Sequence, residues 1–203
     1  MSGFLGVPRL FPWFGSEASP LPTPEVAIMR PNDWLAEIAL EELAKNVREV
    51  GGSNKGPDVE KYQKAANGKA EGEPYCLGFV QYCLDEVERR HSVKPITNRE
   101  VERVWTFFHD APAKAMAVRA MRGFIICWHV IDPKNPNGTN GHAGIIIGAD
   151  GPDKVITVEA NTTPDKSEAG KEREGDGVYR RTRLLAGSPN FKVMGILDPY
   201  AIA

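Results

Sequence analysis

Apolar residues recur at helical spacing through the first half of the chain. The pattern predicts a helix from Asn32 or Asp33, both good N-cap residues, to Val50, where a Gly-Gly pair ends it. A second short helix is predicted over 58–66, and a third over 74–90. The apolar face of the third helix consists of Cys76, Phe79, Val80, Cys83 and Val87.

Two further segments, 99–109 and 111–122, are expected to be helical at least in part. Trp105, Phe107 and Phe108 lie in the first of these segments, and we expect them in the core. Helices therefore come before any strand in the predicted order of elements.

After Gly123 the pattern changes to short β-branched or aromatic runs, separated by Gly, Pro, Asn and Asp. Helices followed by strands are typical of an α+β fold, here with N-terminal helices packed on a C-terminal antiparallel β-sheet of about five to six strands. The charged, glycine-rich segment 165–177 is expected to be a mobile hairpin loop. The predicted strands cover residues 124–130, 142–149, 154–160, 177–183 and 191–197.

The composition is that of an ordinary soluble globular protein, with 203 residues of which 41% are hydrophobic and 26% charged. A net charge of -2 argues against binding nucleic acid through bulk electrostatics. No run of about 18 apolar residues is present, so we expect no membrane span. The first residues lack the basic start and continuous apolar core of a secretory signal, which predicts synthesis in the cytoplasm.

Residues 1–32 differ from the rest, because they combine many prolines and aromatic residues without a regular period. We interpret them as an extended arm, which is either a flexible leader or a segment whose aromatic residues dock on the domain or on a partner. Residues 33–203 then form one domain, which carries the candidate chemistry.

Cys76 is the first candidate for that chemistry. Pro74 suits the first turn of a helix, where its missing N–H is not needed, and Cys76 then lies in the same turn. Unpaired N–H groups and the positive end of the helix dipole favour a thiolate there, and the same groups could stabilise an oxyanion. The alternative is a core cysteine on the apolar helix face, which is how we interpret Cys83. Three cysteines in a chain of this length are expected to be reduced thiols.

Candidate partners for Cys76 lie in the predicted strands. His142 alternates with Gly144, which leaves room beside the imidazole. If its strand forms a hairpin with the next one, Glu159 or Asn161 could reach His142 and fix its tautomer. That set would be a nucleophile, a base and an orienting group.

Each partner also has a simpler interpretation: His142 as a surface or supporting residue, Glu159 as an exposed strand residue and Asn161 as a turn residue. A rival pair, Cys127 and His129, lies two residues apart on one strand, where side chains are held well apart. A zinc site is not expected, because the chain has no H-E-x-x-H or paired CxxC motif and its 4 histidines are scattered.

Three motifs follow one another along the chain: Glu73-Pro74-Tyr75-Cys76-x-x-Phe79-Val80, Gly141-His142-Ala143-Gly144-Ile145 and Val158-Glu159-Ala160-Asn161-Thr162. Their order and separations are similar to those of the CHAP family of cysteine, histidine-dependent amidohydrolases and peptidases, in the papain-like, NlpC-type superfamily. The resemblance covers about residues 33–197. Tyr75 stands where the family usually has Trp, and Phe124 where it often has Asp.

The resemblance implies a papain-like fold and cleavage of an amide bond in bacterial peptidoglycan, the expected partner. The bond is either the one between muramic acid and L-alanine or a peptide bond of the stem or cross-bridge. Cys76 would be the nucleophile and His142 the base, with Glu159 orienting His142 and Asn161 sharing that role or lining the site. Substrate contacts are expected from Tyr75, Asn54 and Trp128.

A phage endolysin or other lysis enzyme, reaching the wall after release, is the first interpretation. The alternatives are a secreted anti-bacterial cell-wall amidase effector and a thiol amidase or acyltransferase acting on a small-molecule amide. A non-enzymatic wall-binding module is disfavoured by the complete Cys, His, Glu and Asn set. We expect a monomer that needs no cofactor and no metal. Calcium in particular is not expected, because no cluster of Asp residues precedes the thiol.

Overall fold

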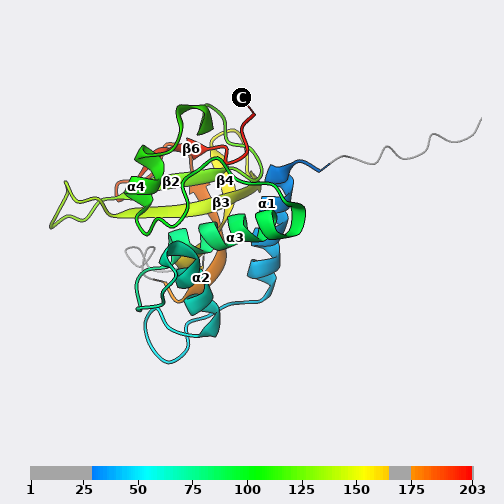
Figure 1. The fold of residues 1–203 in the computed structure, drawn as a ribbon. Helices are drawn as coiled ribbons and strands as arrows, with labels where there is room; N and C mark the ends of the chain where they lie inside the picture. Colours follow the sequence, from blue (N-terminus) through cyan, green and yellow to red (C-terminus); the bar gives the residue numbers. More distant parts are fainter. Residues whose placement is uncertain (1–28, 165–174, 203) are drawn as a thin grey trace, which may run out of the picture.

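The computed structural model describes residues 29–164 and 175–202, with helices first and strands after them (Figure 1). This order confirms the predicted α+β class. Most of the predicted arm and most of the 165–177 loop lie outside the described residues. The helical elements are α1 (Pro31–Ala44), α2 (Pro57–Asn67), α3 (Cys76–His91), α4 (Val104–His109) and the 3-10 turn η1 (Ala113–Ala115).

The strands form one antiparallel sheet of six strands in the order β1-β6-β2-β3-β4-β5. The alternation of apolar residues predicted the five longer strands to within two residues at each end. Their bounds are β1 (Met116–Ala117), β2 (Ile125–Val130), β3 (Gly141–Ala149), β4 (Lys154–Thr162), β5 (Gly177–Leu184) and β6 (Phe191–Leu197).

The predicted end of the first helix at Val50 is wrong. α1 ends at Ala44, and Asn46 takes a left-handed φ of 53° that stops the helix. The chain then pairs with the start of β5, where the N–H of Val178 donates to the carbonyl of Val47 at 3.2 Å. The helix start is also shifted, because Arg30 rather than Asn32 or Asp33 is the N-cap residue.

The two later helix predictions are also largely wrong. Only the end of the 99–109 segment is helical, because the residues before α4 are held extended by the amide of Gln81, which bonds both backbone polar groups of Val101. The 111–122 segment forms η1 and then β1, which pairs with β6. Phe107 is fully buried, as expected, whereas Trp105 and Phe108 are only half-buried.

α3 is the helix that carries the candidate thiol, and it packs closely on α2. A Cβ atom at Gly78 would lie 2.3 Å from the carbonyl oxygen of Tyr62, so only glycine allows this approach. α3 begins at Cys76 with Tyr75 as its N-cap, so Pro74 precedes the helix rather than lying in its first turn. This corrects the position of Pro74 but keeps Cys76 at the helix start.

The sheet separates two apolar clusters. Side chains of α1 and α3 pack against one face, where Ala143 and Ile145 of β3 and Val158 of β4 point, and α2 packs on α3. Figure 1 shows these helices gathered on that side, with α4 beside β2. The other face carries a smaller cluster that includes Trp128 and Phe191. Alternation along β3 directs His142 toward this second cluster.

Candidate active site

Cys76 is the first residue of α3 and lies at a cleft of about 290 Å³. Its side chain is nearly buried, with a relative exposure of 6%, so the cleft is its route to solvent. The first backbone bond of the helix runs from the N–H of Phe79 to the carbonyl of Tyr75 at 2.9 Å. The N–H groups before Phe79 therefore have no acceptor within the helix and lie at the end of α3 that carries the thiol.

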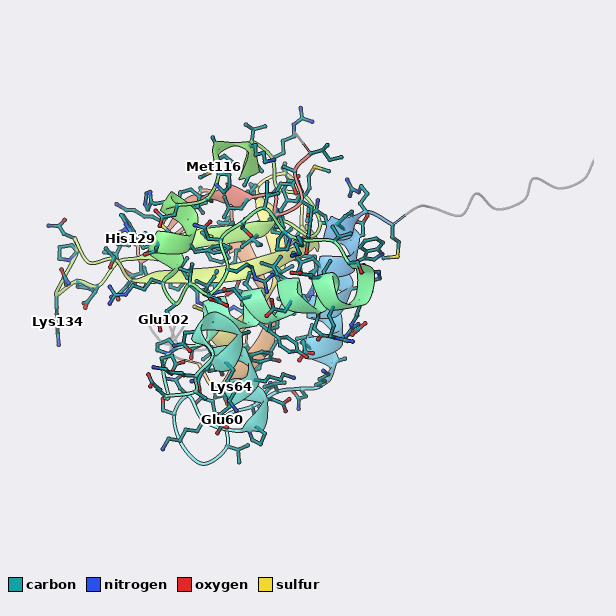
Figure 2. All side chains as sticks on the ribbon, viewed as in Figure 1. Glu60, Lys64, Glu102, Met116, His129 and Lys134 are labelled. Atoms are coloured by element: carbon teal, nitrogen blue, oxygen red, sulfur yellow. The ribbon has the colours of Figure 1, made fainter. Side chains whose placement is uncertain are left out.

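Charged side chains surround the mouth of this cleft. Glu73 enters it from the segment before α3, and Glu102 and Arg103 enter it from the segment before α4. Figure 2 shows Glu102 between α2 and the strands, on the side of the molecule where His129 of β2 lies. The thiol thus lies between the main apolar cluster, to which Cys76 belongs, and a small cleft lined in part by charged residues.

His142 is fully buried and bonds to Glu159, with 2.9 Å between Nε2 and Oε2. The pairing of β3 with β4 extends from Ile145–Val158 to Ala149–Val155, so it stops before His142 and Glu159. The two side chains bridge the strands at the end where backbone pairing has stopped. His142 therefore has the side-chain partner that the sequence predicts, and this partner is Glu159 rather than Asn161.

The Glu159 contact fixes the tautomer of His142. Burial alone would raise the pKa of Glu159, but the charge and hydrogen bonds of Arg183 and the bond with His142 hold it well below its usual range. An ionised carboxylate only accepts hydrogen bonds, so Nε2 of His142 is the donor. The remaining ring nitrogen, Nδ1, is buried and is the one left for Cys76.

Cys76 and His142 interact with each other. Burial lowers the pKa of His142, but hydrogen bonding and charge interaction with Cys76 and Glu159 outweigh burial, and the pKa of His142 is raised overall. A raised imidazole pKa favours transfer of the thiol proton to Nδ1. The three groups thus lie in the order in which the sequence predicts a nucleophile, a base and an orienting carboxylate.

The Glu159 carboxylate accepts four hydrogen bonds. Oε1 accepts from the Thr157 hydroxyl at 2.6 Å and from Nε of Arg183 at 2.9 Å. Oε2 accepts from Nε2 of His142 at 2.9 Å and from Nη2 of Arg183 at 2.5 Å. Sequence reasoning missed both Thr157 and Arg183. The only available signal was alternation, which places Thr157 and Glu159 on one face of their strand.

Gly144 makes room for the carboxylate, as its position beside His142 predicts. A Cβ atom at this residue would lie 2.6 Å from Cγ of Glu159. We expect Gly144→Ala to displace Glu159 from His142 and to lower kcat about 10²-fold, because small misplacements of catalytic groups are costly. Steady-state kinetics beside thermal unfolding measures this, with Gly148→Ala on the same strand as control, since its Cβ would meet only ordinary contacts.

The remaining predicted site residues lie at three different places. Asn161 is buried beside the end of β4, in a left-handed conformation with φ 54°, and its Nδ2 has no hydrogen-bond partner among the described residues. Tyr75 is fully buried and stacks on Tyr62 with ring centroids 6.2 Å apart. Trp128 is buried against His142, with ring centroids 5.7 Å apart. The side chains of Tyr75 and Trp128 therefore do not reach the cleft.

Asn54 is connected to the cleft through the backbone. Its carbonyl accepts a hydrogen bond from Nε2 of Gln63 at 3.0 Å, and the same amide group donates to the carbonyl of Glu73 at 2.7 Å. Gln63 thereby ties the 51–56 loop to the segment that leads into Cys76.

The other two cysteines lie in the core. Burial raises the pKa of Cys83 and of Cys127, which keeps both thiols neutral. His129, the rival partner of Cys127, instead makes a 2.7 Å contact with the carbonyl of Gly138 and packs against Trp105 of α4. The structure therefore brings together Cys76 and His142 rather than the rival pair.

The described residues contain no group of three or more His, Cys, Asp and Glu side chains suited to a metal ion. In the same residues no helix is both long and apolar enough to cross a membrane. Comparison of the chain with protein-family models, curated proteins and solved structures gave no match. What can be inferred about function therefore depends on the motifs and on the geometry of the site.

Proposed function

We propose that the protein is a thiol amidohydrolase of the CHAP type that cleaves an amide bond in bacterial peptidoglycan. The observation that carries this proposal is the chain of contacts from Cys76, at the start of α3, to buried His142 and on to Glu159. Peptidoglycan as substrate comes from the resemblance of the motifs around these residues. A phage lysis enzyme suits this activity, and an effector delivered to other bacteria uses the same chemistry.

The reaction begins with transfer of the Cys76 proton to Nδ1 of His142. Sγ then attacks the amide carbonyl carbon, and the resulting oxyanion accepts hydrogen bonds from the N–H groups at the start of α3. His142 returns its proton to the leaving nitrogen as the C–N bond breaks, which leaves a thioester on Cys76.

Water completes the cycle. His142 takes a proton from the water molecule that attacks the thioester carbonyl, and the C–S bond breaks to release a carboxylic acid and the Cys76 thiol. Glu159 holds the imidazole in one orientation throughout and stabilises the imidazolium each time it forms. This role suits a carboxylate that is ionised and fixed by hydrogen bonds on both of its oxygen atoms.

The test is digestion of purified peptidoglycan by the wild type and by Cys76→Ala, with mass spectrometry of the released fragments. Free stem peptides that begin with L-alanine would identify an amidase, and divided stems or bridges an endopeptidase. If neither protein releases fragments from several wall types while the wild type hydrolyses soluble amides, the wall substrate is wrong and a small-molecule amidase replaces it.

The pH profile of hydrolysis is expected to reflect the raised pKa of His142. The pKa of His142 is raised above its ordinary value, so the imidazolium that protonates the leaving group persists above about pH 6.5 and is lost as pH rises through the raised pKa. We therefore expect the alkaline limb of kcat to have its midpoint above about pH 6.5. Initial rates on dye-labelled peptidoglycan from pH 5 to 10 measure this midpoint. A midpoint below about pH 6.5 would contradict the assignment of His142 as the group that protonates the leaving nitrogen.

A further inference from the structure

A buried arginine lies behind the candidate triad. Arg183 belongs to β5 and has a relative exposure of only 8%. Its Nε and Nη2 atoms donate to the two different oxygens of Glu159, at 2.9 and 2.5 Å. This is the side-on, two-bond geometry in which a guanidinium fixes the plane of a carboxylate.

Aromatic rings hold the guanidinium in place. Cζ of Arg183 lies 4.9 Å from the ring centroid of Phe191 and 5.5 Å from that of Trp128. The same two rings lie 5.8 and 5.7 Å from the imidazole of His142. The rings of Trp128 from β2 and Phe191 from β6 thus flank both the guanidinium and the imidazole, which limits the orientations available to Arg183 and His142.

A buried carboxylate such as that of Glu159 is costly unless it is paired with an opposite charge. Glu159 is fully buried, and the second face of the sheet around it is otherwise largely apolar. An ordinary structural pair could be replaced by apolar residues at little cost, but here one oxygen of the carboxylate also bonds to His142. The pairing of Arg183 with Glu159 therefore points to a role in the candidate active site.

We propose that Arg183 is a positioning residue, which orients the Glu159 carboxylate against Nε2 of His142 and supplies the positive charge that balances this carboxylate beside the Cys76–His142 pair. The proposal deepens the proposed function, on which its catalytic meaning rests. Among the described residues, Arg183 is not one of those that line the cleft at Cys76, so we assign its action to Glu159.

The sign of the electrostatic effect follows from the charges around the imidazole. Among the described residues, the imidazole interacts with Cys76 from α3 and with Glu159 from β4, and Glu159 interacts with Arg183 from β5. The buried thiol of Cys127 from β2 also interacts with Cys76, and β2 and β6 contribute aromatic rings. Glu73, Glu102 and Arg103 lie on the cleft side of the thiol. Loss of the Arg183 charge removes one positive charge, so the coupled thiol and imidazole bind protons more tightly.

The test is the pH dependence of Cys76 alkylation by iodoacetamide, followed by peptide mass spectrometry so that Cys76 is distinguished from Cys83 and Cys127. This reaction reports thiolate formation and needs no wall substrate. We expect Arg183→Gln to move the midpoint of the alkylation profile upward by about one pH unit or more. We also expect kcat on peptidoglycan to fall about 10²-fold with KM nearly unchanged.

Two further variants separate charge from geometry. Arg183→Lys keeps the positive charge but loses the two-bond fork, so kcat should fall while the alkylation midpoint stays near that of the wild type. Glu159→Gln/Arg183→Gln removes both buried charges and should return the midpoint toward the wild-type value. Circular dichroism confirms folding of each variant, and the lysine variant carries the test if Arg183→Gln does not fold.

Arg180→Gln is the matched control, because Arg180 lies on the same strand but is exposed. Arg180→Gln should leave both the midpoint of the Cys76 alkylation profile and kcat on peptidoglycan unchanged. The proposal is overturned if folded Arg183→Gln, or Arg183→Lys in its place, keeps the wild-type kcat. A shift of the alkylation midpoint in Arg183→Gln, together with no wall hydrolysis by the wild type, would overturn the proposed substrate and support the role of Arg183.

Discussion

Cys76→Ala is expected to lose hydrolysis of peptidoglycan almost completely while it keeps the fold. Without Sγ no thioester can form, and kcat should fall by at least about 10⁴-fold. The substitution removes a single sulfur atom at a helix start beside a cleft, so the free energy of unfolding should change by only about 1 kcal/mol. Release of dye from labelled peptidoglycan and urea unfolding of the same preparation measure the two effects.

Cys83→Ala is the matched control for that experiment. Cys83 lies on the same helix, is fully buried and is kept neutral by its surroundings. Its replacement leaves a small cavity and should cost about 1–2 kcal/mol of stability without lowering kcat. The opposite pattern, with Cys76→Ala retaining more than a tenth of the wild-type rate and Cys83→Ala losing it, would exclude Cys76 as the nucleophile.

The strands and the central contact of the site were predictable because both depend on local patterns. A period of two residues sets each strand and its faces, and the Asp150-Gly151 turn joins β3 to β4 as a hairpin. Given that hairpin, Glu159 or Asn161 was expected near His142, and Glu159 makes the contact. The start of α3 was similarly visible, because Cys76 opens an amphipathic run.

The contact of the Arg183 guanidinium with Glu159 was not predictable, because it joins residues that do not face each other across the two strands. Across the pairing of β4 with β5, Glu159 lies opposite Tyr179, whereas Arg183 lies opposite Val155. The long side chain of Arg183 reaches along the sheet to the carboxylate and passes over the aromatic rings. Neighbour rules for cross-strand pairs, which consider facing residues, do not connect Arg183 with Glu159.

The wrong helix predictions have a related cause. Residues 45–50 and 99–103 have sequences compatible with helix, but their backbones are used for long-range bonds to β5 and to Gln81. Tertiary contacts thereby override local propensity, which is a weak preference. Neither segment changes the position of Cys76.

Glu159→Ala is expected to have the largest combined effect on activity and stability. The variant leaves Arg183 buried without its carboxylate, and breaking a buried pair in this way costs about 3–5 kcal/mol of unfolding free energy. It also frees His142 to adopt other orientations and tautomers, so kcat should fall about 10²- to 10⁴-fold. Urea unfolding and initial rates at pH 7 measure both, with Glu60→Gln on the exposed face of α2 as the charge control.

The stability loss of Glu159→Ala should itself depend on pH. Burial alone would raise the folded pKa of Glu159, but the charge and hydrogen bonds of Arg183 together with the bond to His142 hold this pKa below its ordinary value of about 4.5. Its stabilising contribution is therefore complete above about pH 4.5 and is lost as pH falls toward the lowered folded pKa. The difference in unfolding free energy between wild type and variant should shrink steadily below that pH. A difference that stays constant between pH 7 and pH 3 would mean that the ionised carboxylate does not stabilise the fold, and that its role is confined to orienting His142.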